Sequence, residues 1–120
     1  MNDNKMYFML PCENGLIKVS YDVVAMLARG ASMGISGVSE TSSSAEKIEG
    51  WHDYKGVSIS QGTEPDSCSL RLYINVTLGE TIAEIAKAVQ EKVKAEIEAY
   101  TSIKVSSIDV FVSGISFPKK

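Results

Sequence analysis

The chain has 120 residues, of which 44% are apolar and 22% are charged. Both fractions are close to the average for folded globular domains, so they exclude a disordered, collagen-like or coiled-coil-only chain. A chain of this length suits one domain. Its net charge of −3 argues against general binding to nucleic-acid phosphates, and the composition points to no particular chemistry.

The N-terminal residues 1–14 are interpreted as a leader before a single domain at 15–117 and a charged tail at 118–120. The leader's apolar run, Met6–Leu10, is shorter than the roughly 7–15 apolar residues of a signal peptide. No segment approaches the roughly 20 apolar residues that span a bilayer. We therefore expect a cytoplasmic protein without direct membrane insertion, which would reach the inner face of the membrane only through a partner.

The first predicted elements are a strand and a helix. Apolar and polar residues alternate from Leu16 to Val19, which predicts a short strand. Ser20 can cap the free N–H groups of the following helix, and a series of glycines that begins at Gly30 would end it. The residues expected on the apolar face of this helix are Val23, Val24, Leu27, Ala28 and Ala31.

The middle of the chain has weaker signals. Residues 38–44 are rich in Ser and Thr and predict an irregular link, and residues 45–51 could form a short helix. Val57 and Ile59 lie on one side of a predicted strand, and a turn over 62–67 follows.

The clearest strand signal covers residues 68–78, where apolar residues alternate strictly with polar or amphipathic ones. Such alternation is typical of a strand that is covered on one side. A helix of about 20 residues follows, and Thr81 and Glu84 fit a capping box at its start. Its apolar stripe consists of Ile82, Ile85, Ala86, Val89, Val93, Ile97 and Tyr100.

The last segment, 103–117, is again strand-like, but its alternation slips at Ser106-Ser107 and at Gly114, which predicts two bulges. The order of the elements and the single apolar face of each predict an α+β fold. We expect a two-layer sandwich in which two main helices cover one face of a curved, mixed or antiparallel sheet of about four strands. The other face of the sheet would be open.

Few residues suggest catalysis or metal binding. His52 is the single histidine and precedes Asp53, but neighbours along a chain rarely face each other, so we expect an ordinary exposed or loop histidine. Cys12 and Cys68 match no metal or redox spacing, which predicts two free thiols. We therefore expect no catalytic residue, no bound cofactor and no metal.

A short glycine motif raises the question of nucleic-acid binding. Gly34-Ile35-Ser36-Gly37 matches the G-x-x-G loop that joins two helices in KH-type RNA-binding domains. Such loops usually have basic residues nearby, whereas the flanks here are uncharged Ser, Met and Val. A glycine stop at the end of a helix is the simpler interpretation.

The open sheet face is the surface best suited to recognition. Tyr73 and Phe111 would place two aromatic rings on this face. Such a pair is typical both of a stacking platform for bases or sugars and of a protein–protein contact. Two further interpretations are that the leader Met6–Leu10 folds back over these rings, or that a second copy of the chain covers them. The acidic charge disfavours nucleic acid. The residues expected on this face are Arg71, Tyr73, Asn75, Asp109 and Phe111.

Several blocks of sequence, in this order and spacing, carry a resemblance to a known family. They are Gly15-Leu16-Ile17-Lys18-Val19-Ser20, Lys55-Gly56-Val57, Leu72-Tyr73-Ile74-Asn75-Val76, Ile82-Ala83-Glu84-Ile85-Ala86, Ile108-Asp109-Val110-Phe111-Val112 and Gly114-Ile115-Ser116-Phe117. Over about residues 15–117 the sequence resembles the alkaline shock protein family, the envelope stress response proteins of Gram-positive bacteria. Ser102 stands where the family often has a glycine.

The resemblance implies a small α+β domain with no established catalytic activity and no catalytic residues. It also implies a link to alkaline and cell-envelope stress, self-association and, for some members, a membrane-anchored protein partner. We accordingly expect a non-enzymatic structural or interaction protein that forms a homo-oligomer and binds protein partners. The alternative is a nucleic-acid-binding module with a KH-like or sheet-face surface.

Overall fold

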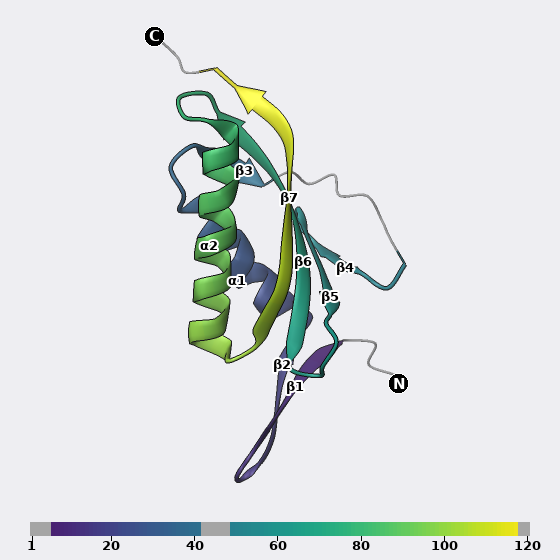
Figure 1. The fold of residues 1–120 in the computed structure, drawn as a ribbon. Helices are drawn as coiled ribbons and strands as arrows, with labels where there is room; N and C mark the ends of the chain where they lie inside the picture. Colours follow the sequence, from purple (N-terminus) through teal and green to yellow (C-terminus); the bar gives the residue numbers. More distant parts are fainter. Residues whose placement is uncertain (1–5, 42–48, 118–120) are drawn as a thin grey trace.

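The computed structural model describes residues 6–41 and 49–117. A five-stranded sheet, a separate two-stranded hairpin and two helices make up the fold, and both helices lie on one face of the sheet (Figure 1). The predicted two-layer α+β class is confirmed, with more strands than expected. In chain order the elements are β1 (Tyr7–Cys12), β2 (Gly15–Ser20), α1 (Tyr21–Met33), β3 (Val38–Thr41), β4 (His52–Tyr54), β5 (Val57–Gln61), β6 (Ser67–Thr77), α2 (Ile82–Thr101) and β7 (Lys104–Ser116).

The central strand of the five-stranded sheet is β6. β7 runs parallel to β6 along its whole length on one edge. On the other edge of β6, β5 pairs antiparallel with its first half and β3 pairs antiparallel with its second half, while β4 lies outside β5. β7 is therefore an edge strand, and none of the described residues forms a strand on its outer side.

The core lies between β6 and the helices. Leu70, Leu72, Ile74 and Val76 are fully buried, as their alternation predicts, and burial of each such side chain stabilises the fold by about 1.5–3 kcal/mol. Val23 and Tyr100 are exposed although the helical patterns assigned them to apolar faces. The buried helix residues are Tyr21, Val24, Ala25, Ala28, Ala31, Ser32, Ile85, Val89, Val93 and Ile97.

The helix ends confirm one predicted cap and correct another. Ser20 Oγ accepts a hydrogen bond from the backbone N–H of Val23 at 3.2 Å, so the predicted N-cap of α1 is confirmed. Thr81 precedes α2, but its side chain makes no capping bond, so the predicted capping box with Glu84 is wrong. Ser102 ends α2 with a φ of 64°, a left-handed conformation that favours glycine.

Both predicted bulges in the last strand are present. The register between β6 and β7 shifts twice, and the residues without an opposite partner are Ser106 and Ser113. After the second bulge the Asn75 side chain fills the space beside Gly114, so that a Cβ added at Gly114 would lie 2.7 Å from Asn75 Oδ1. A side chain at this position would therefore have to displace the Asn75 amide, which glycine avoids.

Two predictions for the first half of the chain are wrong. Within the predicted irregular link at 38–44, Val38–Thr41 form β3, and residues 42–44 lie outside the described residues. The expected helix at 45–51 is not present in its described part: residues 49–50 form a turn before β4. Residues 45–48 lie outside the described residues, as do 1–5 and the predicted tail at 118–120.

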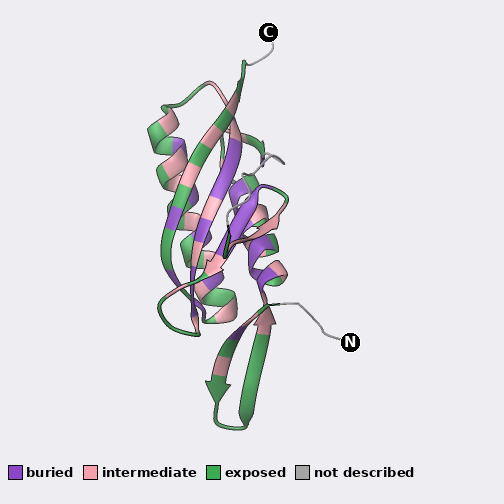
Figure 2. Ribbon diagram, turned by 90° about the vertical axis from the view of Figure 1, so that its right-hand side faces the viewer, coloured by how far each residue is buried: buried purple, intermediate pink, exposed green. Residues whose placement is uncertain are grey.

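The leader does not cover the open sheet face. Its residues Tyr7–Cys12 form β1, which pairs with β2 in a hairpin that projects from one end of the sandwich and is largely exposed (Figures 1 and 2). Phe8 is fully buried at the base of this hairpin, where its ring stacks on Tyr21 with 4.3 Å between centroids. The interpretation in which Met6–Leu10 fold back over Tyr73 and Phe111 is therefore wrong.

Candidate functional site

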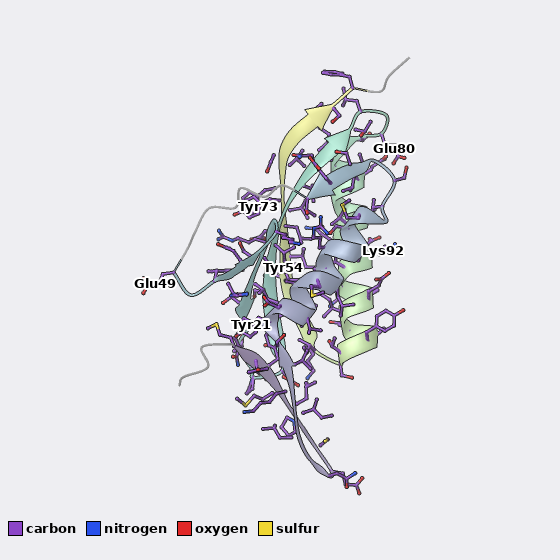
Figure 3. The ribbon with its side chains drawn as sticks, turned by 180° about the vertical axis from the view of Figure 1, so that it is seen from behind. Tyr21, Glu49, Tyr54, Tyr73, Glu80 and Lys92 are labelled. Carbon is purple, nitrogen blue, oxygen red and sulfur yellow. The ribbon has the colours of Figure 1, made fainter. Side chains whose placement is uncertain are left out.

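The five predicted face residues lie together on the side of the sheet opposite the helices. In the parallel pairing of β6 and β7, Arg71 lies opposite Asp109 and Tyr73 lies opposite Phe111. Because side chains at alternate positions of a strand share one face, Asn75 joins them. Figure 3 shows Tyr73 on the side of the sheet away from α2, which carries Lys92. These five residues are called the β6–β7 face.

A stacked aromatic pair occupies the middle of the β6–β7 face. The centroids of the Tyr73 and Phe111 rings are 4.8 Å apart, and the ring planes make an angle of 13°. A stacked pair of this kind stabilises the contact by more than the burial of its apolar surface alone. Tyr73 is only 8% exposed, whereas Phe111, on the edge strand, is 41% exposed. The sequence predicted two accessible rings, but within one chain the accessible ring is Phe111.

The guanidinium of Arg71 lies near two aromatic rings. Its guanidinium carbon is 4.9 Å from the centroid of Trp51 and 5.8 Å from that of Phe111, within the range of cation–π contacts. Arg71 Nε is buried and has no hydrogen-bond partner among the described residues, an arrangement that costs of order 1–3 kcal/mol. Trp51 was not predicted to lie at this face, because nothing in the sequence indicates how the loop before β4 turns.

The end of the face near β3 is polar. Asn75 Nδ2 donates a hydrogen bond to Glu40 Oε2 at 3.3 Å, and Ser39 Oγ donates to the backbone oxygen of Asn75 at 3.1 Å. Both partners lie on β3, so this short strand fixes the orientation of Asn75. The face therefore combines an aromatic and cationic centre with a hydrogen-bonding end, a composition typical of protein interfaces.

His52 lies away from the β6–β7 face, and its side chain has a structural role in connecting two elements of the fold. His52 Nε2 is 2.6 Å from Asp22 Oδ1, at the start of α1, and the two residues are 30 positions apart in the sequence. The neighbouring Asp53 instead accepts a hydrogen bond from Ser58 Oγ at 2.6 Å. This bridge connects β4 to α1, and sequence spacing gave no signal for it.

The cysteines are free, as predicted: Cys12 is exposed and Cys68 is buried. Burial, and secondarily the nearby Glu98 carboxylate, raises the pKa of the Cys68 thiol to about 12, so this thiol is protonated at neutral pH. In residues 6–41 and 49–117, no three His, Cys, Asp or Glu side chains come together as a possible metal site. Neither described helix is both long and apolar enough to cross a membrane.

The glycine motif does not form a KH-like loop. Gly34–Gly37 joins α1 to β3, whereas the KH loop joins two helices. The backbone N–H of Gly34 donates to the oxygen of Ala31 at the helix end, and a Cβ at Gly37 would lie 2.7 Å from Ile85 Cδ1. The glycines therefore end a helix and allow close packing against α2.

A second surface was not predicted from the sequence. A groove of about 630 Å³ lies between the hairpin and the ends of both helices. It depends on the position of the hairpin relative to the C-terminal end of α2, which no sequence pattern indicates. Residues lining this apolar groove include Leu10, Ile17, Val19, Val23 and Tyr100.

Comparison with known proteins decides the family. The sequence model of the alkaline shock protein 23 family, described as having a cell envelope-related function, matches residues 10–117. The chain belongs to this family. The match includes every residue of the β6–β7 face and confirms the resemblance seen in the sequence.

Relatives of this alkaline shock family chain include two bacterial proteins of similar length. The protein YloU of Bacillus subtilis (strain 168) is 30% identical over 108 residues, which cover 84% of this chain and 88% of YloU. The protein Spy1614 of Streptococcus pyogenes serotype M6 is 29% identical over 108 residues, which cover 86% of this chain and 89% of Spy1614. Among solved structures, a variant of the MamM CTD is similar in part, with a TM-score of 0.45 and 15% identity over 78% of this chain and 93% of that chain.

Proposed function

We propose that this alkaline shock family protein is a non-enzymatic interaction protein of the envelope stress response type. It acts by associating with itself and with protein partners through the β6–β7 face. The observation that carries this proposal is the stacked Tyr73–Phe111 pair beside Arg71, on the sheet face that neither helix covers. Aromatic residues and arginine are enriched at protein interfaces and at their energetic centres.

The proposed place of action is the cytoplasm, with attachment to the inner face of the membrane through a membrane-anchored protein. The cell envelope-related function of the family supports this location. The nucleic-acid alternative has less support, because the chain carries a net charge of −3 and its glycine motif joins a helix to a strand.

Sedimentation velocity of the full chain over a micromolar concentration series tests the proposed self-association. We expect dimers or larger species for the natural sequence. Phe111→Ser should weaken association by roughly 10-fold, since a central aromatic residue at an interface is worth more than 1 kcal/mol. Tyr100→Ser is the matched control, because Tyr100 is an exposed aromatic residue on α2, outside the β6–β7 face.

Two results would count against the proposal. A chain that stays monomeric throughout the series and binds no membrane-anchored protein has no interaction role of this kind. Equal effects of Phe111→Ser and Tyr100→Ser would place the contact elsewhere on the molecule. Fluorescence anisotropy with short single-stranded RNA and DNA provides a further check, and micromolar affinity would favour the nucleic-acid alternative.

A further inference from the structure

The directions of the backbone N–H and C=O groups of β6 show which residues of β7 direct their own backbone groups toward β6. The N–H of Tyr73 donates to the oxygen of Gly56 at 2.9 Å, and the N–H of Thr77 donates to that of Gly37 at 2.7 Å. Odd-numbered residues of β6 therefore direct their backbone groups to β5 and β3, and even-numbered residues direct theirs to β7. This alternation follows from strand geometry, in which successive residues point their backbone groups to opposite sides.

The same alternation assigns the backbone groups of β7. Phe111 lies opposite Tyr73, so in a parallel ladder its own N–H and C=O bond to the residues on either side of Tyr73. The flanking residues Val110 and Val112 consequently direct their N–H and C=O groups away from the sheet. Ser116, beyond the second bulge, faces inward again, since its oxygen accepts the N–H of Leu78 at 2.9 Å.

Helix α2 covers the outer edge of β7 in its first half. The N–H of Val105 donates to Glu98 Oε2 at 3.0 Å, and the oxygen of Val105 accepts from Lys94 Nζ at 3.5 Å. The oxygen of Ile108 accepts from Gln90 Nε2 at 2.9 Å. Gln90, Lys94 and Glu98 are spaced four apart and form one stripe along the helix.

The side chains of α2 cover the outward backbone groups of β7 only as far as Ile108. The same stripe of α2 continues with Ala86 and Ile82, whose side chains have no hydrogen-bonding group. The outward groups of Val110 and Val112, called the free edge, accordingly have no side-chain or loop partner among the described residues. Natural edge strands are usually protected by Lys, Pro or inward-pointing charges.

The composition of this part of β7 also favours pairing with another strand. Between Val105 and Ser116 there is no Lys and no Pro, and Asp109 is the single charged residue. Its side chain lies on the β6–β7 face, beside the exposed ring of Phe111. The free edge is thus short, nearly uncharged and adjacent to an accessible aromatic residue.

We propose that the free edge pairs with the free edge of a second copy of this chain, antiparallel and about a two-fold axis at Phe111. This inference rests on the proposed self-association and specifies its geometry. Val110 of each copy lies opposite Val112 of the other, and these are the residues whose outward groups can form hydrogen-bonded pairs. Both copies thereby satisfy their outward N–H and C=O groups, and two sheets become one.

The aromatic stack and the charges favour a second copy as the occupant. With the axis at Phe111, the two Phe111 side chains become neighbours and the Tyr73–Phe111 stack continues across the interface on one face. Asp109 lies opposite Ser113 of the other copy, so the two carboxylates do not face each other, as like charges directly opposite would destabilise the pair. The segment is therefore complementary to itself.

A backbone substitution tests the pairing directly. Val112→Pro removes an outward N–H, and proline is tolerated on edge strands where the N–H faces away from the sheet. Val112→Ala is the matched control, because it removes side-chain packing but keeps the N–H. In sedimentation velocity we expect Val112→Pro to weaken dimerisation at least roughly 10-fold relative to Val112→Ala, since two hydrogen bonds are lost per dimer.

Cysteine cross-linking tests the register without proline. In a Cys12→Ser background, Phe111→Cys places two thiols on the axis, where opposite Cα atoms are roughly 4.5 Å apart, close enough for a disulfide. Ser113→Cys is the control, because those two positions would be offset by roughly 13 Å along the strands. Because Phe111→Cys also removes the ring expected to stabilise the contact, both variants are oxidised at a protein concentration roughly 10-fold above the dissociation constant of Phe111→Ser. We expect a disulfide-linked dimer for Phe111→Cys and a monomer for Ser113→Cys.

The outcomes separate this inference from the proposed function. If Val112→Pro and Val112→Ala associate equally while Phe111→Ser weakens association, the strand pairing is wrong and the β6–β7 face remains the contact. If Ser113→Cys cross-links and Phe111→Cys does not, the proposed register is wrong. If the natural chain never associates, both proposals fail. Should Val112→Pro not fold, the cysteine pair decides alone.

Discussion

At Ser102 the backbone turns out of α2 with a φ of 64°, and this conformation is unfavourable for any residue with a Cβ. Ser102→Gly should therefore raise the free energy of unfolding by roughly 1 kcal/mol, less a small loss because glycine is more mobile when unfolded. Urea denaturation measures this change. An unchanged or lower stability would show that the serine carries no strain.

Tyr73 and Phe111 touch each other but differ in burial. Tyr73→Ala should lower the free energy of unfolding by about 3 kcal/mol, because a nearly buried ring is removed. Phe111→Ala should cost about 1 kcal/mol, since that ring is 41% exposed in the single chain. Chemical denaturation at a concentration where the protein is monomeric compares them. Equal losses would mean that Phe111 belongs to the core of one chain.

Single residues were predicted well where alternation alone decides the face. Leu72 and Tyr73 are on opposite sides of β6 because adjacent strand residues must be. How far a side chain is exposed depends on neighbours that the pattern does not contain: Trp51 reaches Arg71 from the segment before β4, and Tyr100 stays 75% exposed at the end of α2. Burial of single side chains was therefore predicted less well than their faces.

The contact between α2 and β7 depends on the charge of one carboxylate. The hydrogen bond from the Val105 N–H, and secondarily Lys94, lowers the pKa of Glu98 below its usual range. At pH values above the pKa that Glu98 has in the unfolded chain, the ionised carboxylate therefore stabilises the folded chain in full. This contribution is lost as the pH falls through the lower pKa that Glu98 has in the folded chain. The protection of the β7 edge should weaken in acid.

Glu98→Gln tests this dependence. The natural chain should be more stable than the variant at neutral pH, and the difference should shrink as the pH falls below about 4.5. Urea denaturation at a series of pH values measures it, with Glu91→Gln, an exposed substitution on the same helix, as the control. A difference that stays constant with pH would contradict the role of the ionised carboxylate.

Elements with a clear apolar pattern were predicted, including the short strands β2 and β5, whereas β3 and β4 were not. β6 and α2 bury a continuous apolar face, and each bulge of β7 appears as a phase slip because two residues of one strand face one of the other. β3 and β4 have only four and three residues, with no apolar alternation. They form because β6 and β5 offer unpaired backbone groups, which is a tertiary effect.

Two surfaces of the folded chain are accessible to other proteins. The β6–β7 face and its free edge combine stacked rings with unpaired backbone groups. The apolar groove beneath the hairpin is lined by half-exposed side chains such as Ile17. Family membership followed from the sequence, but the separation of these two surfaces required the fold, because it depends on where the hairpin projects.

Amide NMR spectra of the full chain, recorded over a dilution series, would test most directly which surface carries association. We predict that concentration-dependent shifts appear at Val110, Phe111 and Val112 and on neighbouring residues of the β6–β7 face. Shifts confined to the apolar groove, around Ile17 and Val23, would contradict association through the β6–β7 face, and so would spectra that do not change with concentration.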